Sequence, residues 1–395
     1  MPAVFCASAD VNPLAPPAAL GEPRAAYLHV PFCAHRCGYC NFTLVAGRDD
    51  LVPRYLEALE AELALAGAPR SVETLFIGGG TPTHLAPRQL RRLLDLAARW
   101  HPLETGGELS VEANPSDLGP ERCAALAAGG VTRVSLGAQS FSPRKLRLLE
   151  RDHRAADIEQ AARGVRAAGA SLSLDLIFGA PGETLAEWRD DLSAALALEP
   201  DHLSIYGLTI ERGTAFFARR LRGELACIDE DLERTLYLAA IDALVAAGFE
   251  HYEVSNFARS EHRCRHNEVY WAGRPYYAAG PGAARYVAGR REVNHRSPFT
   301  WMQRIAAGRT PVAECEVLAP EDRAREALVL GLRRMRGVER AAFGREFGYE
   351  VDELGGTALE RFVAEGWLAD HGDRLALTRA GLLVSDALWP ALLRV

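Results

Sequence analysis

Three cysteines lie close together near the start of the chain, in the segment CAHRCGYC over residues 33–40. The CxxxCxxC spacing of Cys33, Cys37 and Cys40 puts three thiolates in one short loop, where they can surround a soft metal centre. Structural zinc normally takes a fourth protein ligand, and His35 is expected to point elsewhere from so short a loop. Iron–sulfur clusters are held by cysteines in short loops of this kind, and three cysteines on a four-iron cluster leave one iron free. A zinc site and three buried structural cysteines are the alternatives.

A second group of candidate residues lies at the ends of later apolar runs. The segment GGGTP at 78–82 follows one run; its glycines allow close approach of a ligand to the backbone, and its proline stiffens the exit. Glu112, Gln139 and Asp175 each lie within or just after a different run, and Arg151 comes twelve residues after Gln139. Each of these residues, taken singly, is equally well explained as a solvated or salt-bridged group at a strand end.

The elements that must position these residues follow a regular order. Six short apolar runs alternate with helical stretches, at residues 25–32, 72–80, 108–115, 133–140, 172–182 and 202–210. The runs are apolar for several residues in succession, as in parallel strands that are covered on both faces. Repeated strand–helix units imply a parallel sheet with right-handed connections. Because the candidate residues lie at the ends of different strands, and a barrel gathers those ends at one mouth, we expect an α/β fold with a partial (β/α)6 barrel.

The alternation changes beyond about residue 215. A helix over roughly 229–247 is expected, because it starts with acidic residues and is followed by Gly248. The segment at 366–388 predicts a strand, a tight turn, a strand and a helix, which resembles the wing of a winged helix. We therefore predict a loose tail (1–24), a β/α domain (25–215), a connecting region (216–310) and a mainly helical C-terminal domain (311–395).

Composition excludes several classes of protein. The chain has 395 residues, of which 48% are hydrophobic and 25% charged, as in globular proteins. It carries 45 basic and 52 acidic residues and a formal charge of −7, without a basic tract, so nucleic-acid binding is not expected. It shows neither a secretory signal nor an apolar run long enough to span a membrane. Together with eight cysteines, these features predict a reducing, cytoplasmic location.

The CxxxCxxC motif after the first strand of a β/α domain resembles the radical S-adenosylmethionine (SAM) superfamily. This resemblance implies a [4Fe–4S] cluster on Cys33, Cys37 and Cys40, with its open iron chelated by the amino and carboxylate groups of SAM. It also implies one-electron cleavage of SAM to methionine and a 5′-deoxyadenosyl radical. The order of the strand-end residues resembles the oxygen-independent coproporphyrinogen III oxidase-like branch. The SAM-binding residues implied by this resemblance are Tyr27, Tyr39, Gly79, Gly80, Thr81, Glu112, Gln139, Arg151 and Asp175.

Two features distinguish the oxidases from the heme chaperones within that branch. The oxidases carry a longer N-terminal region and a fourth cysteine two residues after the third, where this chain has Phe42. The segment HNEVYW at 266–271 resembles the HNxxYW heme motif of the HemW-type heme chaperones. The heme-binding residues implied by this resemblance are His266, Asn267, Tyr270 and Trp271.

The chemistry of this segment is consistent with a heme site. Neutral imidazole is a common axial ligand of heme iron, and aromatic rings offer flat faces for a porphyrin. Arg263 and Arg265 flank the segment and are suited to pair with propionates. A packed aromatic corner around a hydrogen-bonded histidine is the alternative.

The predicted function is that of a heme chaperone, more carrier than catalyst, that delivers heme to respiratory hemoproteins. The partners implied are heme, a recipient hemoprotein, an electron donor (flavodoxin-like, ferredoxin-like or a reduced nicotinamide system) and a second copy of the chain. The first alternative is oxidative decarboxylation of coproporphyrinogen III. The second is a radical SAM enzyme that modifies nucleic acid, which the acidic charge disfavours.

Overall fold

The computed structural model describes residues 21–394, so most of the predicted tail (1–24) lies outside the described residues. Its largest element is a nine-stranded sheet with strand order β11-β1-β4-β5-β6-β7-β8-β10-β9. Six consecutive strands of this sheet are parallel. They are β1 (Ala25–Val30), β4 (Val72–Gly79), β5 (Leu103–Ala113), β6 (Arg133–Gln139), β7 (Ser171–Phe178) and β8 (His202–Gly207). The predicted partial (β/α)6 barrel is confirmed.

Residues beyond 215 extend this sheet at both edges. Strand β11 (Tyr277–Ala279) pairs in parallel with β1. Strand β10 (Asn256–Ala258) pairs antiparallel with β8 and with β9 (Glu250–Glu253). The segment predicted as a connecting region therefore contributes strands to the same sheet as the strand–helix repeats.

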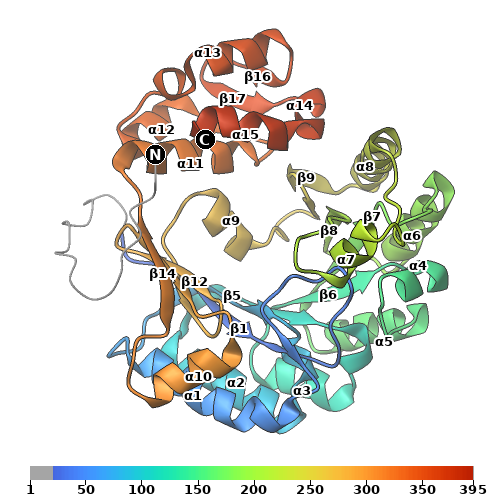
Figure 1. The fold of residues 1–395 in the computed structure, drawn as a ribbon, viewed down its shortest axis with the longest axis vertical. Helices are drawn as coiled ribbons and strands as arrows, with labels where there is room; N and C mark the ends of the chain where they lie inside the picture. Colours follow the sequence, from blue (N-terminus) through green and yellow to red (C-terminus); the bar gives the residue numbers. More distant parts are fainter. Residues whose placement is uncertain (1–20, 395) are drawn as a thin grey trace.

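Helices cover the outer face of the sheet (Figure 1). Their starts follow the local sequence. Thr184 accepts a hydrogen bond from the backbone N–H of Glu187 in a capping box, and Asp229 caps the predicted helix that follows it. The helices up to residue 246 are α1 (Val52–Ala64), α2 (Pro87–Trp100), α3 (Pro120–Ala128), α4 (Pro143–Leu148), α5 (Ala155–Ala167), α6 (Leu185–Ala197), α7 (Ala215–Leu221) and α8 (Glu230–Ala246). Single 3-10 turns occur at Asp49–Leu51, Pro82–His84 and Pro115–Asp117.

Smaller elements complete the chain. Helix α9 (Arg265–Trp271) contacts β4 and β5, and Figure 1 shows it between the barrel and the C-terminal region. Helix α10 (Pro298–Ala306) packs on α1. The short sheets contain β2 (Phe32–Cys33) with β3 (Val45–Ala46), and β12 (Ala284–Val287), β13 (Arg290–Asn294) and β14 (Val312–Val317).

The C-terminal region is mainly helical, as the sequence predicts. The expected strand, turn and strand are β16 (Leu368–Asp370) and β17 (Arg374–Leu377), which pair antiparallel, and β17 also pairs with β15 (Val338–Glu339). The helices of this region are α11 (Pro320–Leu332), α12 (Arg340–Phe347), α13 (Val351–Ala364), α14 (Arg379–Leu383) and α15 (Ser385–Leu393). None of the helices in residues 21–394 combines the length and the apolar character needed to cross a membrane.

A buried ionic network fixes the segment that follows β6. Lys145, the only lysine of the chain, is 1% exposed and pairs with Glu183 and, at 3.1 Å, with Asp191. Asp191 also accepts hydrogen bonds from the hydroxyl of Ser140 and the backbone N–H of Phe141. The network thus holds the chain directly after the end of β6, where the site described next is built.

Candidate functional site

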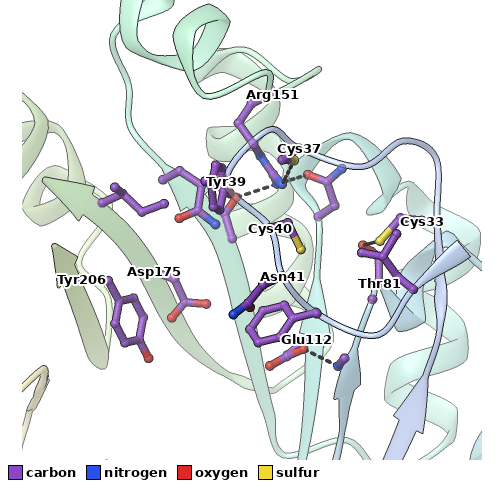
Figure 2. Close-up of a pocket in the computed structure, with 18 of the residues that line it drawn as sticks. Cys33, Cys37, Tyr39, Cys40, Asn41, Thr81, Glu112, Arg151, Asp175 and Tyr206 are labelled. Atoms are coloured by element: carbon purple, nitrogen blue, oxygen red, sulfur yellow. Dashed lines mark hydrogen bonds between the residues drawn. The ribbon is translucent and has the colours of Figure 1, made fainter. Parts of the chain in front are cut away.

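A cavity of about 520 Å³ lies where the parallel strands reach their carboxyl ends (Figure 2). The register brings these ends together, because Val30 pairs with Gly79 and Phe178 with Gly207. The cavity is lined by the three clustered cysteines and by all of the predicted SAM-binding residues except Tyr27. Residues separated by more than a hundred positions in the sequence therefore face one space.

The cysteine loop follows β1 directly and is held by local contacts. Its backbone turns where the N–H of Cys40 donates to the carbonyl oxygen of Cys37 at 3.1 Å. The Sγ atom of Cys33 lies 3.3 Å from the hydroxyl of Thr81. A Cβ atom on Gly38 would come within 2.3 Å of the ring of Phe216, so any side chain at this turn would displace that buried ring. The conformation of the cysteine loop therefore depends on its contacts with Thr81 and Phe216.

The arrangement of the cysteines distinguishes a cluster from a single metal ion. Cys33, Cys37 and Cys40 form no disulfide, and no three His, Cys, Asp or Glu side chains among residues 21–394 converge on one ion. A tetrahedral zinc site needs such convergence, whereas a four-iron cluster takes each cysteine on its own iron. Three cysteines on the wall of one cavity of this size therefore fit a cluster better than zinc.

The glycine segment after β4 brings backbone to the cavity wall. The N–H of Gly80 donates to the carbonyl oxygen of Val30, and that of Thr81 donates to the carbonyl oxygen of Phe32, both at 2.7 Å. A Cβ atom on Gly80 would lie 2.7 Å from the latter oxygen, and Gly79 has a φ of +115°. Side chains at these two positions would push the segment away from the cysteine loop.

Glu112 and Asp175 give the cavity an acidic floor. Glu112 accepts a hydrogen bond from the backbone N–H of Gly79 at 2.7 Å, and Asp175 accepts one from the hydroxyl of Ser135 at 3.1 Å. Burial raises the pKa of Glu112 to about 7, and the nearby Asp175 adds to the rise. Burial also raises the pKa of Asp175. A cationic ligand group placed between them would favour their ionised forms, so this floor suits an ammonium or sulfonium group.

Arg151 supplies the opposite charge on the cysteine side (Figure 2). Its guanidinium donates hydrogen bonds to Cys37 Sγ at 3.4 Å, to Asn114 Oδ1 at 2.7 Å and to the carbonyl oxygen of Gly137 at 3.1 Å. Its Nε atom is buried and has no hydrogen-bond partner among the described residues. A carboxylate ligand is a natural partner for such a group. Nearby, Gln139 has a φ of +62°, a conformation that β-branched residues do not tolerate.

A second cavity of about 220 Å³ continues from the first into the barrel. The two share Glu112, Ser135, Asp175 and Tyr206 as lining residues. The second is also lined by His266, Asn267 and Tyr270 of the HNEVYW segment, and by Tyr27, whose hydroxyl is hydrogen-bonded to His29 Nδ1 at 2.9 Å. The predicted heme motif and the predicted SAM pocket are therefore neighbours.

His266 is held from both sides of its ring. It is 1% exposed, with Nδ1 hydrogen-bonded to the hydroxyl of Thr74 at 3.0 Å and Nε2 to the hydroxyl of Tyr270 at 2.8 Å. Burial lowers its pKa to about 3, so the ring is neutral at physiological pH. The carboxylate of Glu108 accepts hydrogen bonds from the backbone N–H groups of Arg265 and His266 and so fixes the start of α9.

Trp271 is the member of the predicted heme motif that does not line this cavity. Its ring lies under the guanidinium of Arg333, 4.9 Å from the ring centroid, on the side of the C-terminal region. The structure thus brings three residues of the motif together and directs the fourth elsewhere.

Several lining residues escaped the sequence analysis. Arg133, Ser135 and Gly137 are examples: together with the predicted Gln139 they alternate along β6 and line the two cavities, whereas Val134, Leu136 and Ala138 between them are buried in the core. This alternation of period two was the signal that could have identified Arg133 and Ser135.

Comparison with known proteins identifies the family to which the chain is similar. Residues 27–195 match the radical SAM superfamily, and residues 318–384 match the HemN C-terminal domain. The chain is 41% identical to the heme chaperone HemW of Mycobacterium tuberculosis (strain ATCC 25618 / H37Rv), over 94% of this chain and 95% of that one. It is 34% identical to the heme chaperone HemW of Bacillus subtilis (strain 168), over 94% and 99% of the two chains.

A solved structure shares the fold. The coproporphyrinogen III oxidase HemN of Escherichia coli, described as a radical SAM enzyme, matches with a TM-score of 0.83 over 94% of this chain and 90% of that one. The two sequences are 21% identical, so this likeness establishes the architecture alone.

Proposed function

The chain belongs to the HemW family of radical SAM proteins, and from this premise we propose that it is a heme chaperone that binds heme and delivers it to respiratory hemoproteins. The observation that carries the proposal is the similarity to HemW proteins along nearly the whole chain, at 41% identity, against 21% for the oxidase. This contrast favours the chaperone over coproporphyrinogen oxidation. Phe42, at the position where the oxidases carry a fourth cysteine, supports the same choice.

Membership of the radical SAM superfamily implies a [4Fe–4S] cluster and SAM, and the first cavity fits both. When bound, the cluster with SAM supplies one-electron chemistry. We propose that Cys33, Cys37 and Cys40 hold the cluster, with Tyr39 packed beside them against Phe216.

The remaining lining residues suit SAM. The acidic floor of Glu112 and Asp175 complements its cationic groups, and the guanidinium of Arg151 complements its carboxylate. The backbone of Gly79, Gly80 and Thr81 permits close approach, and Gln139 completes the wall. Tyr27 would act from the second cavity.

We further propose that heme binds at the HNEVYW segment with His266 as an iron ligand and Asn267 and Tyr270 beside the porphyrin, and that Trp271 contributes from outside the second cavity. The neutral imidazole suits ligation. In the present conformation both ring nitrogens are engaged, so ligation through Nε2 requires the hydrogen bond to Tyr270 to break.

The test is an anaerobic titration of cluster-reconstituted protein with hemin, followed by absorbance. His266→Ala is expected to abolish saturable binding, and His371→Ala, which alters an exposed turn, is expected to bind as wild type. Tyr270→Phe removes the competing hydrogen bond and is expected to tighten binding about fivefold, because one such bond is worth about 1 kcal/mol. Unchanged binding in His266→Ala would refute the assignment of the ligand, and no binding by the wild type would refute the chaperone.

The proposal also includes a cytoplasmic location, a flavodoxin-like, ferredoxin-like or reduced nicotinamide electron donor, and a homodimer. The location is a prediction from the composition and the cysteines, and the electron donor and the homodimer are predictions from the family resemblance.

A further inference from the structure

Asn114, directly after the end of β5, contacts the guanidinium of Arg151 at the wall of the first cavity. It is 7% exposed and lines that cavity. Its Oδ1 atom accepts a hydrogen bond from Nη2 of Arg151 at 2.7 Å. The other two contacts of this guanidinium are longer, 3.1 Å to the carbonyl oxygen of Gly137 and 3.4 Å to the sulfur of Cys37. Asn114 therefore supplies the shortest hydrogen bond that holds Arg151 in place.

The surroundings of Asn114 favour one orientation of its amide. Its Nδ2 atom donates hydrogen bonds to the hydroxyl of Ser116 at 3.0 Å and to Oδ1 of Asp152 at 3.3 Å. Burial raises the pKa of Asp152, but the hydrogen bond from Asn114 lowers it. The charges of His35 and Arg151 lower it further, so the pKa lies below its ordinary value and the ionised carboxylate only accepts hydrogen bonds. Turning the amide over would set Nδ2 against a guanidinium and Oδ1 against a carboxylate.

The fixed amide in turn restricts the guanidinium of Arg151. Two acceptors, Asn114 and the backbone of Gly137, hold its Nη2 atom. A guanidinium is planar and rigid, so holding Nη2 in this way also sets the directions of Nη1 and Nε. Nη1 donates to the sulfur of Cys37, and Nε is buried without a hydrogen-bond partner among the described residues.

These two nitrogens bear on two different properties of the site. A hydrogen bond to a cysteine sulfur stabilises the more negative, reduced state of an iron–sulfur cluster, so it raises the reduction potential. A buried N–H group without a partner favours a ligand that brings a carboxylate, because an unsatisfied buried donor is costly. The orientation of Arg151 therefore links the potential of a cluster to the binding of a carboxylate.

We propose that Asn114 is a positioning residue, which acts through Arg151 to set both the reduction potential of the cluster and the affinity for SAM. The inference rests on the proposed function, because it concerns the proposed cluster on Cys33, Cys37 and Cys40 and the proposed SAM site in the first cavity. It adds to that site a residue that shapes it through a neighbouring side chain.

The test compares cluster-reconstituted wild type with Asn114→Leu and the matched control Ser116→Ala. The reduction potential is measured without SAM in a redox titration followed by electron paramagnetic resonance, and SAM affinity is measured by anaerobic calorimetry. Asn114→Leu keeps a similar volume but loses the acceptor. It is expected to shift the potential to more negative values and to weaken SAM binding about tenfold, because hydrogen bonds to charged groups are the stronger ones. Ser116→Ala leaves the contacts of Asn114 with Arg151 and Asp152 in place and should match wild type in both measurements.

A double-mutant cycle shows whether Asn114 acts through Arg151. Arg151→Gln removes the guanidinium, so adding Asn114→Leu to it is expected to change neither the potential nor the SAM affinity further. A residue that merely supported the fold would have the same effect in both backgrounds.

The outcomes separate this inference from the proposed function. A wild type that assembles no cluster or binds no SAM would refute the proposed cofactors themselves. An unchanged potential or an unchanged SAM affinity in Asn114→Leu, or effects that simply add to those of Arg151→Gln, would overturn the role of Asn114 and leave the cofactors intact. Circular dichroism and cluster absorbance report whether Asn114→Leu folds and assembles. If it does not, Asn114→Ala, which introduces no bulk, is measured in its place with the same expectations.

Discussion

Glu112→Gln is expected to stabilise the SAM-free protein, increasingly so as the pH rises. Burial raises the pKa of Glu112 from 4.5 to about 7, so ionisation of this carboxyl is harder in the native state than in the unfolded chain. Below pH 4.5 the group is protonated in both states and costs nothing. Stability is lost as the pH rises from there through 7, and above 7 the full cost is about 3 kcal/mol. A glutamine side chain removes this cost, and its amide oxygen can still accept the hydrogen bond from Gly79.

Urea unfolding of the cluster-free, reduced protein measures this effect. The gain in unfolding free energy of Glu112→Gln over wild type is expected to increase by about 2.5 kcal/mol between about pH 5 and about pH 8. Glu57→Gln, at an exposed site on α1, is the matched control and should show no such trend. The same Glu112 variant should bind SAM more weakly, because the acidic floor is halved. A gain independent of pH, or a loss of stability at high pH, would refute the reasoning.

Two further predictions concern the walls of the site. Gly80→Ala places a Cβ atom 2.7 Å from a backbone oxygen and is expected to weaken SAM binding at least about tenfold by calorimetry. Gly119→Ala, whose Cβ meets nothing within 4 Å, should bind as wild type, and equal affinities for all three proteins would contradict the steric argument. Asp191→Ala removes one partner of the buried Lys145 and is expected to cost about 3–5 kcal/mol in urea unfolding. A loss no larger than that of the exposed neighbour Asp190→Ala would show that the network contributes little.

The barrel is predictable from the sequence because each of its strands has a recognisable pattern of neighbouring residues. Continuous apolar runs identify all six parallel strands, and the chemistry-bearing residues follow the ends of those strands. Since parallel strands present their carboxyl ends at one mouth, position along the chain was sufficient to group Glu112, Gln139 and Asp175 before any coordinates. The structure places all three on one cavity.

The interior of the barrel was not predictable in the same way. Arg133 stands at the beginning of its strand, where a charged residue is ordinarily solvated, and only pairing with both neighbouring strands turns it inward. The position of α9 depends on contacts such as that between Glu108 and the backbone of His266, which join residues far apart in the sequence. No local pattern specifies such a contact. The alternation along β6 could have suggested the inward face, but not what lies opposite it.

The burial of Lys145 affects how the folded protein reacts with reagents that modify amines. An acylating reagent needs an exposed, neutral amine, and the only ε-amino group of this protein is buried between two carboxylates. The folded chain therefore offers no lysine amine to such a reagent, and Lys145 can be labelled only after the segment behind β6 has opened. The fraction of chains that carry a label on Lys145 consequently reports how often this part of the native core has opened.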